Sequence, residues 1–363
     1  MKMSTRLRPT ELVSLLESGD SATTWRECRM GEPVVQACAL HGWEDCLISI
    51  GISAEHALAA VGFAPGTVHN ALGTLPLKAF AKIAEYVGEK AALPAATWTL
   101  GMNYDLDELG PVGAAIASGS TLGNALRRFS SHFELLQDTS MLEIVVKEDI
   151  ATISYRILDP EIWPRHHDAL FTLGIVAQII KRAVPDALAE MDFCFECERR
   201  ETGLPVSGSQ ILFGGESNTI SIPVALLDAL MPRGDRNCDL RNLSSLLTQK
   251  RRTAPARDRL ATIIYARLSQ GEINQDELAR EIGMSSRTMR RRLSETSLTF
   301  QQLLDECRMR QAMLEFKAHP QNSIAQIALR LGYAEHSNFT RAFSRWAGMP
   351  PQQYRVMALN AAH

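Results

Sequence analysis

The chain of 363 residues lacks long apolar segments and a disulfide framework. No stretch approaches the roughly 20 consecutive apolar residues that a membrane-spanning helix needs, and the N-terminus lacks the apolar run of a signal peptide. The seven cysteines are scattered and odd in number, unlike the paired cysteines of small secreted proteins. These absences predict a soluble, cytoplasmic protein without membrane association.

The sequence also lacks the common groupings of catalytic or metal-binding residues. Cys194 and Cys197 are spaced like half of a zinc site, but no second pair follows, and their segment alternates like a strand. His166 and His167 are adjacent, so on a helix they point about 100° apart and do not share one face as metal ligands would. The glycine pair at 214–215 lacks the lysine and helix start of a phosphate-binding loop. We therefore expect no enzyme, no cofactor and no metal site.

Charge is distributed unevenly along the chain, although the net charge is only -3. Residues 248–363 carry 18 Lys and Arg against 10 Asp and Glu, a charge of +8. Residues 1–247 carry 20 against 31, a charge of -11. An acidic body joined to a basic C-terminal part predicts that only the C-terminal part faces a polyanion.

One short pattern occurs twice in the basic part, and both copies are typical of a helix-turn-helix. Each predicts a short amphipathic helix ending at a glycine, which tolerates the positive φ of a tight turn, followed by a helix with apolar residues four apart. The first copy contains Leu278, Ala279, Ile282, Gly283, Met289 and Leu293, and the second contains Ile327, Ala328, Leu331, Gly332, Phe339 and Phe343. Two recognition helices on one chain predict a DNA-binding protein.

The acidic body shows both helical and strand periodicity, which predicts an α+β domain with helices packed on an antiparallel sheet. The expected helices are 43–50, 53–61, 76–91, 120–138 with Ser120 as N-cap, 163–184 and 223–230, and the expected strands are 141–147, 151–157, 191–197, 210–213 and 218–222. The predicted organisation is an N-terminal extension (1–42), an effector-sensing and dimerisation domain (43–230), a polar linker (231–253) and an all-α DNA-binding domain (254–363).

The C-terminal motifs resemble the DNA-binding domain of the AraC/XylS family of transcriptional regulators. The resemblance covers about residues 254–356 and rests on QDELAREIGMSSRTMRRRL (275–293), SIAQIALRLGY (323–333) and SNFTRAFSRWAGMPPQQYR (337–355). Ser297 departs from the family, which usually has glycine after the first recognition helix. Pro350 stands where many members have Ser or Thr.

The body from about 75 to 247 is similar to the arabinose-binding-type regulatory domain of one branch of that family. The similarity rests on TLPL (74–77), LGPVGAAI (109–116), STLGNAL (120–126) and the helix after Trp163. It implies a ligand-responsive transcription factor, an activator of a catabolic operon, with RNA polymerase and a second copy of the chain as partners. The name of the domain does not indicate that arabinose is the effector. The alternatives are a DNA-binding regulator without a small-molecule effector, controlled by abundance or a protein partner, and an enzyme fused to a DNA-binding module, which would need a reactive thiol at Cys194 or Cys197.

The spacing of the two copies suggests how double-stranded DNA is read. Residues 300–318 are predicted as one helix of roughly 28 Å, which can separate two recognition helices so that they dock into successive major grooves. The residues expected to turn outward and read bases are Arg287, Arg290, Arg291, His336, Ser337, Asn338 and Arg341, because arginine can pair with guanine and asparagine with adenine. Arg292 and Arg345 are expected to contact phosphates.

A small-molecule pocket in the body would need aromatic walls with a few polar anchors. The candidates are Trp98, Tyr104, Phe133, Trp163 and His166, each of which could equally be a core residue. A cationic effector, such as an amine or amino-acid-like catabolite, would match the body's carboxylates and aromatic rings, although the sequence does not demand it.

Overall fold

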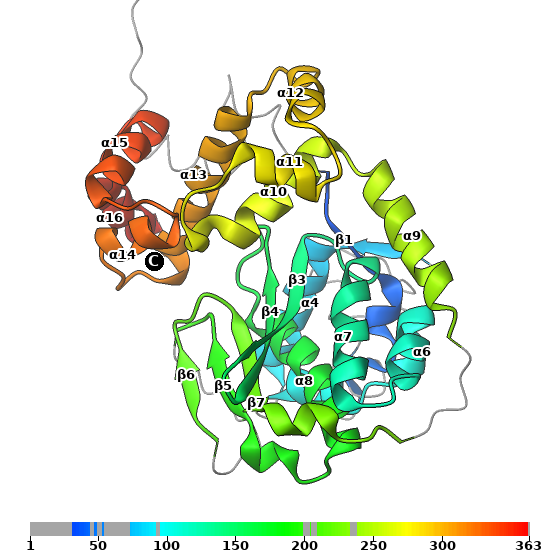
Figure 1. The fold of residues 1–363 in the computed structure, drawn as a ribbon. Helices are drawn as coiled ribbons and strands as arrows, with labels where there is room; N and C mark the ends of the chain where they lie inside the picture. The colour runs from blue at the N-terminus through cyan, green and yellow to red at the C-terminus, as the bar shows by residue number, and fades with distance from the viewer. Residues whose placement is uncertain are drawn as a thin grey trace, which may run out of the picture. The chain divides into compact units, whose positions relative to one another are not determined.

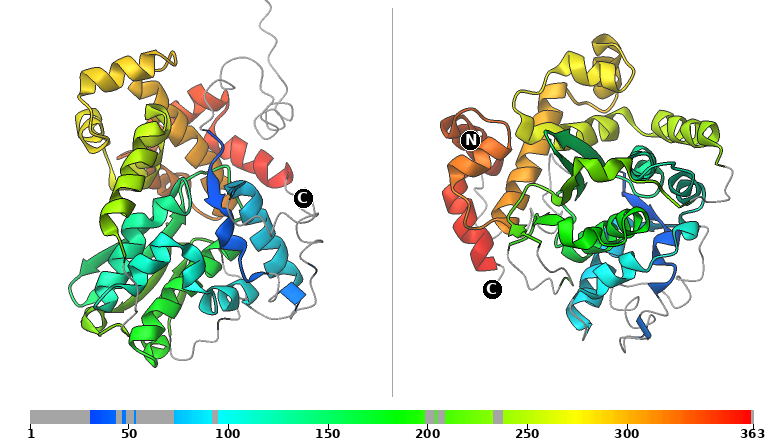
Figure 2. Two further views of the ribbon diagram at one scale, coloured as in Figure 1. Left: turned by 90° about the vertical axis from the view of Figure 1, so that its right-hand side faces the viewer. Right: turned by 60° about the horizontal axis from the view of Figure 1, so that its bottom comes forward.

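The computed structural model describes residues 31–43, 47–48, 53, 73–91, 95–198, 204, 209–232 and 238–361. It divides into two compact units, which we call the body (32–254) and the C-terminal module (255–361, with Gly31). Figures 1 and 2 show the helices and strands of each unit. The helices expected at 43–50 and 53–61 lie almost entirely outside the described residues.

The body contains a five-stranded sheet in the order β3-β4-β7-β5-β6 (Figure 1). The strands are β3 (Ser140–Lys147), β4 (Ile150–Ile157), β5 (Asp192–Phe195), β6 (Ile211–Phe213) and β7 (Asn218–Pro223), close to the predicted ranges. All neighbours are antiparallel except β5 and β6, for which the prediction of an antiparallel sheet is wrong. Residues 196–210 between these two strands are long enough for the crossover that parallel pairing requires.

The inner face of the sheet is covered by helices, and α8 is the most deeply buried of them. The helices are α4 (Leu77–Lys90), α5 (Ala96–Met102), α6 (Pro111–Ala117), α7 (Leu122–His132) and α8 (His166–Ala183), with short 3₁₀ helices between them. Alpha-helices α5 and α8 cross closely at Gly101 and Gly174, since a Cβ on Gly101 would lie 2.1 Å from the Phe171 carbonyl oxygen. The predicted helix at 223–230 is a 3₁₀ helix, Val224–Asp228.

Two helix ends differ from the prediction. Thr121, not Ser120, caps α7, because its hydroxyl accepts the Asn124 N–H, and the helix ends at His132 instead of continuing to 138. Helix α8 begins at His166 and not at Trp163, since Pro164 disfavours the helical conformation of the residue before it.

Two segments predicted outside the body domain pack within the body (Figure 2). Strand β1 (Val34–Gln36), from the expected N-terminal extension, pairs with β2 (Thr74–Pro76) and buries Val35. The expected linker contains helix α9 (Leu240–Thr253), whose Lys250 forms an ion pair with Asp138 at 2.6 Å. A polar composition predicts a linker, but an amphipathic helix on a protein surface has a similar composition.

The C-terminal module is all-helical in its described residues, as predicted. Its helices are α10 (Ala256–Arg267), α11 (Gln275–Glu281), α12 (Ser286–Ser294), α13 (Phe300–Ala318), α14 (Ile324–Arg330), α15 (His336–Ala347) and α16 (Pro351–Ala361). Side-chain caps define the starts of four of them: Asn274, Ser285, Thr299 and Ser323 each accept backbone N–H groups of the first turn. Across the described residues of both units, no helix is long and apolar enough to span a membrane.

Candidate nucleic-acid interface

The C-terminal module holds two helix-turn-helix units, α11–α12 and α14–α15, with the predicted glycine turns. Gly283 has φ of 72° and Gly332 has φ of 75°, the left-handed region that glycine enters without steric cost. The same backbone bond closes each turn, from Met284 N–H to the Ala279 carbonyl (2.9 Å) and from Tyr333 N–H to the Ala328 carbonyl (3.0 Å). The sequence repeat is therefore also a structural repeat.

The repeat extends one helix further back than the motif suggested. Arg259 of α10 donates a hydrogen bond to the Ile282 carbonyl (3.0 Å), and Arg308 of α13, 49 residues later, donates one to the Leu331 carbonyl (3.2 Å). Each arginine thus satisfies a carbonyl at the end of the first helix of its unit, where intrahelical partners run out. Sequence reasoning missed this pair, although an arginine at the same offset as the rest of the repeat was the available signal.

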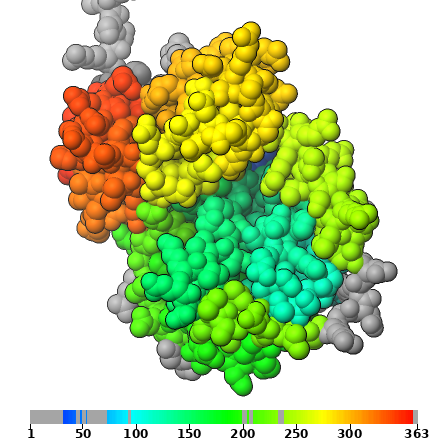
Figure 3. Space-filling model, in the orientation of Figure 1, coloured from blue at the N-terminus to red at the C-terminus, as the bar shows by residue number. Residues whose placement is uncertain are grey.

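The first recognition helix, α12, lies on the surface of the module (Figure 3). Met289 and Leu293 are buried, as predicted, which turns the arginines outward. The exposed residues at spacing three and four, Arg287, Arg290, Arg291 and Ser294, line a hollow of about 700 Å³ between α12 and the start of α13. The three arginines predicted to read bases therefore share one face, and Arg292 lies off it.

Among the described residues, no carboxylate forms an ion pair with this arginine face. All four arginines of α12 are exposed, and Arg292 likewise forms no ion pair with a described residue. An uncompensated cluster of guanidinium groups beside a hollow can attract a polyanion such as the DNA backbone.

The second recognition helix, α15, presents a different surface. Phe339 and Phe343 are buried, and all the residues predicted to contact DNA are exposed: His336, Ser337, Asn338, Arg341 and Arg345. Several of them have protein partners: Arg341 donates to the Asn338 side-chain oxygen (2.6 Å), the Ser337 hydroxyl donates to Glu335 (3.2 Å), and Arg345 pairs with Asp305 of α13 (2.9 Å). The Arg341–Asn338 bond holds two base-reading candidates together as one group.

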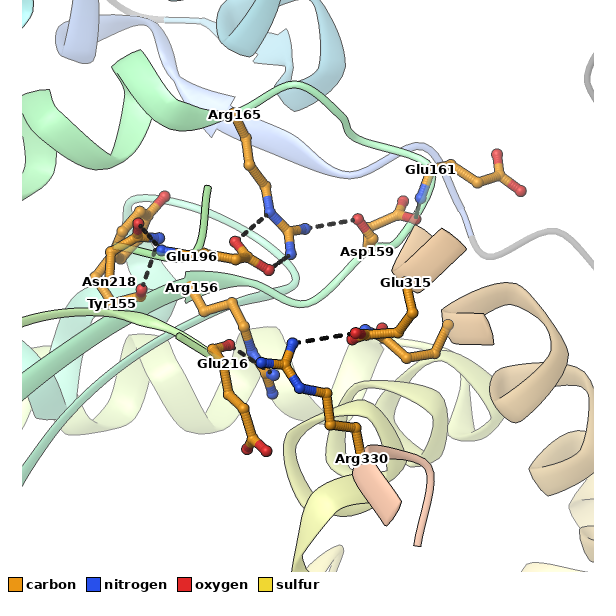
Figure 4. Close-up of polar contacts among 11 residues, drawn as sticks. Tyr155, Arg156, Asp159, Glu161, Arg165, Glu196, Glu216, Asn218, Glu315 and Arg330 are labelled. Carbon is orange, nitrogen blue, oxygen red and sulfur yellow. Dashed lines mark hydrogen bonds and ion pairs between the residues drawn. The ribbon is translucent and has the colours of Figure 1, made fainter. Parts of the chain in front are cut away.

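Helix α13 joins the two units and covers the predicted residues 300–318 without a break. Its 19 residues correspond to roughly 28 Å. Figure 1 shows α12 and α15 on either side of α13. Ion pairs connect α13 to helices near both of its ends: Glu306 accepts from Arg257 of α10 in a buried pair (3.0 Å), and Glu315 accepts from the half-buried Arg330 of α14 (3.1 Å, Figure 4).

In the body, the five predicted effector residues do not form one group. Trp98, Tyr104, Phe133 and His166 are buried, each in edge-on contact with a different aromatic ring, while Trp163 is half-buried beside the Arg165 guanidinium. Trp98 and His166 are linked, because Phe193 and Phe195, the rings they contact, stack on each other. These contacts are those of core residues.

A buried polar cluster at the start of α8 was not foreseen. Arg165 forms a two-pronged ion pair with Glu196 (Figure 4), and the Tyr155 hydroxyl donates to Asp168 (2.6 Å). The other carboxylate oxygen of Asp168 is buried without a hydrogen-bond partner. Burial raises the pKa of Asp168 to about 7, with a further contribution from Glu85 and against the opposing effects of Tyr155 and Arg165. Alternating strand and helix patterns gave no hint that these residues would meet.

The two cysteines of the Cys-x-x-Cys segment lie in different surroundings. Cys197 is buried with its sulfur 3.2 Å from Nδ1 of His166, and Cys194 is half-buried in β5. In the described part of the chain, no group of three or more His, Cys, Asp or Glu side chains is arranged to hold a metal ion.

Two helix-turn-helix units on a shared helix, with exposed arginines on a recognition helix, define a DNA-binding regulator. A helix-turn-helix domain model matches residues 278–357, and the model for the N-terminal arabinose-binding domain of AraC transcription regulator matches residues 51–231. The chain belongs to the AraC family of transcriptional regulators.

Relatives are similar over nearly their full length. The ornithine utilization regulator of Pseudomonas aeruginosa is 26% identical over 335 residues, 89% of this chain and 96% of the relative. The HTH-type transcriptional regulator VirS of Mycobacterium tuberculosis is 24% identical over 334 residues, with the same coverage of 89% and 96%. The crystal structure of transcriptional regulator CdpR from Pseudomonas aeruginosa matches with a TM-score of 0.34 and 22% identity, over 83% of this chain and 96% of that one. These relatives are transcriptional regulators and not enzymes.

Proposed function

We propose that this regulator reads two successive major grooves of its operator, one with α12 and the other with α15. The observation that carries the proposal is the pair of exposed recognition helices joined by the unbroken helix α13. A separation of roughly 28 Å along α13 suits two grooves that lie one DNA turn, about 34 Å, apart.

In this proposal, Arg287, Arg290 and Arg291 read bases from the first unit, because they share the face that lines the hollow. His336, Ser337, Asn338 and Arg341 read bases from the second unit. Arg292 lies off the arginine face and Arg345 is exposed beside α13, and both contact phosphates.

The test begins with operators selected from a random DNA pool by the full-length protein. Footprinting should show two protected major-groove segments with centres about 10 base pairs apart. Protection of a single segment, or of segments without a helical spacing, would contradict two-groove reading.

We further propose that the body senses a small organic effector, of the amine or amino-acid class, and that binding changes the balance between two arrangements of the protein. Three observations support a cationic ligand: the charge of -11 in residues 1–247, the unpartnered buried oxygen of Asp168, and the similarity to a regulator named for ornithine utilization. A buried carboxylate without a full set of partners is stabilised by a cation.

Thermal unfolding of the full chain with a panel of amino acids, diamines and neutral sugars tests this part. A specific ligand raises the melting temperature by mass action, and we expect ornithine-like diamino compounds to do so and sugars not to. Asp168→Asn, which keeps an acceptor for Tyr155 but removes the charge, should abolish the response. No response to any cationic compound would favour the second candidate, a regulator controlled by abundance or by a protein partner.

The regulator is proposed to act as an activator of a catabolic operon and to recruit RNA polymerase. Transcription in a purified system, with the selected operator placed upstream of a weak promoter, should rise when the effector is added. A fall in transcription would instead indicate a repressor.

A further inference from the structure

Strand β3 is an outer strand of the body's sheet, and in the described residues β4 is its only strand partner (Figure 1). Bonded and non-bonded pairs alternate along an antiparallel ladder, so one bond fixes the parity of the strand. Leu158 N–H donates to the Thr139 carbonyl (2.6 Å), which means that odd-numbered residues of β3 bond to β4. The even-numbered residues direct their N–H and C=O groups to the open edge.

Contacts at this edge agree with that parity. The Ser130 hydroxyl of α7 donates to the carbonyl of Leu142, an even-numbered residue (2.7 Å). Beyond it, the outward-facing backbone groups belong to Ile144 and Val146. Val145 is 36% exposed and Val146 is 50% exposed, so apolar side chains accompany the open backbone groups. An exposed apolar edge of this kind is a template for pairing with another strand.

The edge sequence Glu143-Ile144-Val145-Val146-Lys147 is complementary to itself in the antiparallel direction. If two copies cross at Val145, Ile144 lies opposite the partner's Val146 and exchanges both backbone hydrogen bonds with it, as its parity allows. Glu143 then lies opposite the partner's Lys147 in a non-bonded pair, where facing side chains approach most closely. Both charged side chains are exposed and lie on the outer face of the sheet with Val145.

We propose that two copies of this chain pair through β3 about a two-fold axis at Val145, which continues one sheet across the dimer. This inference rests on the expectation of a homodimer and names the surface that forms it. Complementary charge, apolar content and backbone parity all select the same register. Because five residues of strand make a small contact, we expect a weak dimer with a micromolar Kd.

Charge reversal at the two paired positions tests the register in the full chain. Glu143→Lys places lysine opposite lysine, and Lys147→Glu places glutamate opposite glutamate, twice in each dimer. Each single variant should raise the dimer Kd by about tenfold or more in sedimentation equilibrium. Asp228→Lys, an exposed reversal on a 3₁₀ helix away from β3, is the matched control and should leave the Kd unchanged.

Two combinations of these substitutions make the test specific for the proposed register. The double variant Glu143→Lys with Lys147→Glu restores opposite charges at both sites and should dimerise as the original does. An equimolar mixture of the two single variants should form a heterodimer, since every facing pair then has opposite charge. A merely destabilised fold would be rescued by neither.

The inference is overturned if the unaltered chain is monomeric at about 100 µM, or if the single variants dimerise as tightly as it does. DNA binding separates these outcomes from the proposed function. A monomeric chain that still protects two operator segments would retain the two-groove proposal and lose the β3 dimer.

Discussion

The two helix-turn-helix units have the same backbone conformation at the turn but differ in packing and in charge. A Cβ on Gly283 would meet nothing within 4 Å, whereas one on Gly332 would lie 2.6 Å from the Leu268 carbonyl oxygen and 2.7 Å from that of Gly271. The second turn is therefore packed tightly against residues 268–271, a short 3₁₀ helix and its end just after α10, while the first has open space beside it. The recognition helices differ as well: among the described residues the arginines of α12 form no ion pair, whereas Arg341 and Arg345 of α15 have partners. The same sequence pattern thus gives two different units. The second has a tightly packed turn, and the first has an open turn and a more strongly charged recognition helix.

The largest expected difference between the two units is in the free energy of unfolding lost when the glycine of each turn is replaced. Gly332→Ala forces a positive φ on alanine and drives its Cβ into two backbone oxygens, so we expect a loss of at least about 3 kcal/mol. Gly283→Ala has only the φ penalty and should lose about 1–2 kcal/mol. Hydrogen exchange of amides in the C-terminal module measures both losses. Equal losses would show that the second turn is not tightly packed.

The next largest effect is expected on the free energy of specific DNA binding, when residues of the two recognition helices are replaced. Arg291→Ala and Arg341→Ala should each cost about 1–3 kcal/mol on the selected operator and relax the preference at one base. Because Arg341 donates to Asn338, a double-mutant cycle should show coupling between these two and none between Arg291 and Asn338. Arg292→Ala is the control, with an expected loss that is uniform across sequences. Uniform losses for Arg291 or Arg341 would reassign that residue to the phosphates.

The salt dependence of binding should separate the two charge environments. Asp305→Ala releases Arg345 from its ion pair, so the slope of log K against log salt should steepen by up to about one unit. Arg292→Ala should make it shallower by about one unit. Binding titrations between low and moderate salt give both slopes, and an unchanged slope for Asp305→Ala would mean that Asp305 does not compete with a phosphate for Arg345.

The smallest expected effect concerns the ends of the recognition helices. The second ends at Gly348 with φ of 71°, but the first is followed by Ser297 with φ of 57°, a conformation that disfavours a side chain. Ser297→Gly should stabilise the module by about 0.5–1 kcal/mol, and Gly348→Ser should destabilise it by a similar amount. Thermal unfolding of the full chain checks both, and destabilisation by Ser297→Gly would contradict the strain.

Local patterns predicted much of the C-terminal module. Helix α13 covers the predicted range 300–318, and Met289, Leu293, Phe339 and Phe343 are buried as expected. The exposure of the arginines follows directly from that burial. The ion pair between Arg345 and Asp305 joins residues 40 apart on different helices, and no local pattern encodes it.

In the body, the sequence predicts the individual strands and helices better than it predicts how they pair and pack. Strands β3 and β4 lie within one residue of the alternating pattern, but the parallel pairing of β5 with β6 depends on the route of the segment between them. The sequence pattern places Asp168 on a helix and says no more, because its contact with Tyr155 and its raised pKa arise from tertiary burial. Strand β1 is short, and its pairing with β2 joins distant segments.

Helix α13, which joins the two helix-turn-helix units, also determines the angle between the two recognition helices about its axis. Each residue of an α-helix advances the axis by about 1.5 Å and turns it by about 100°. One residue inserted into α13 would therefore rotate the second recognition helix by more than a quarter turn relative to the first, so that the two could no longer face successive grooves of one duplex as proposed. A seven-residue insertion would nearly restore the angle and lengthen the rod by about 10 Å, or roughly three base-pair steps. On the proposed two-groove reading, the number of residues in α13 determines how far apart the two operator segments lie.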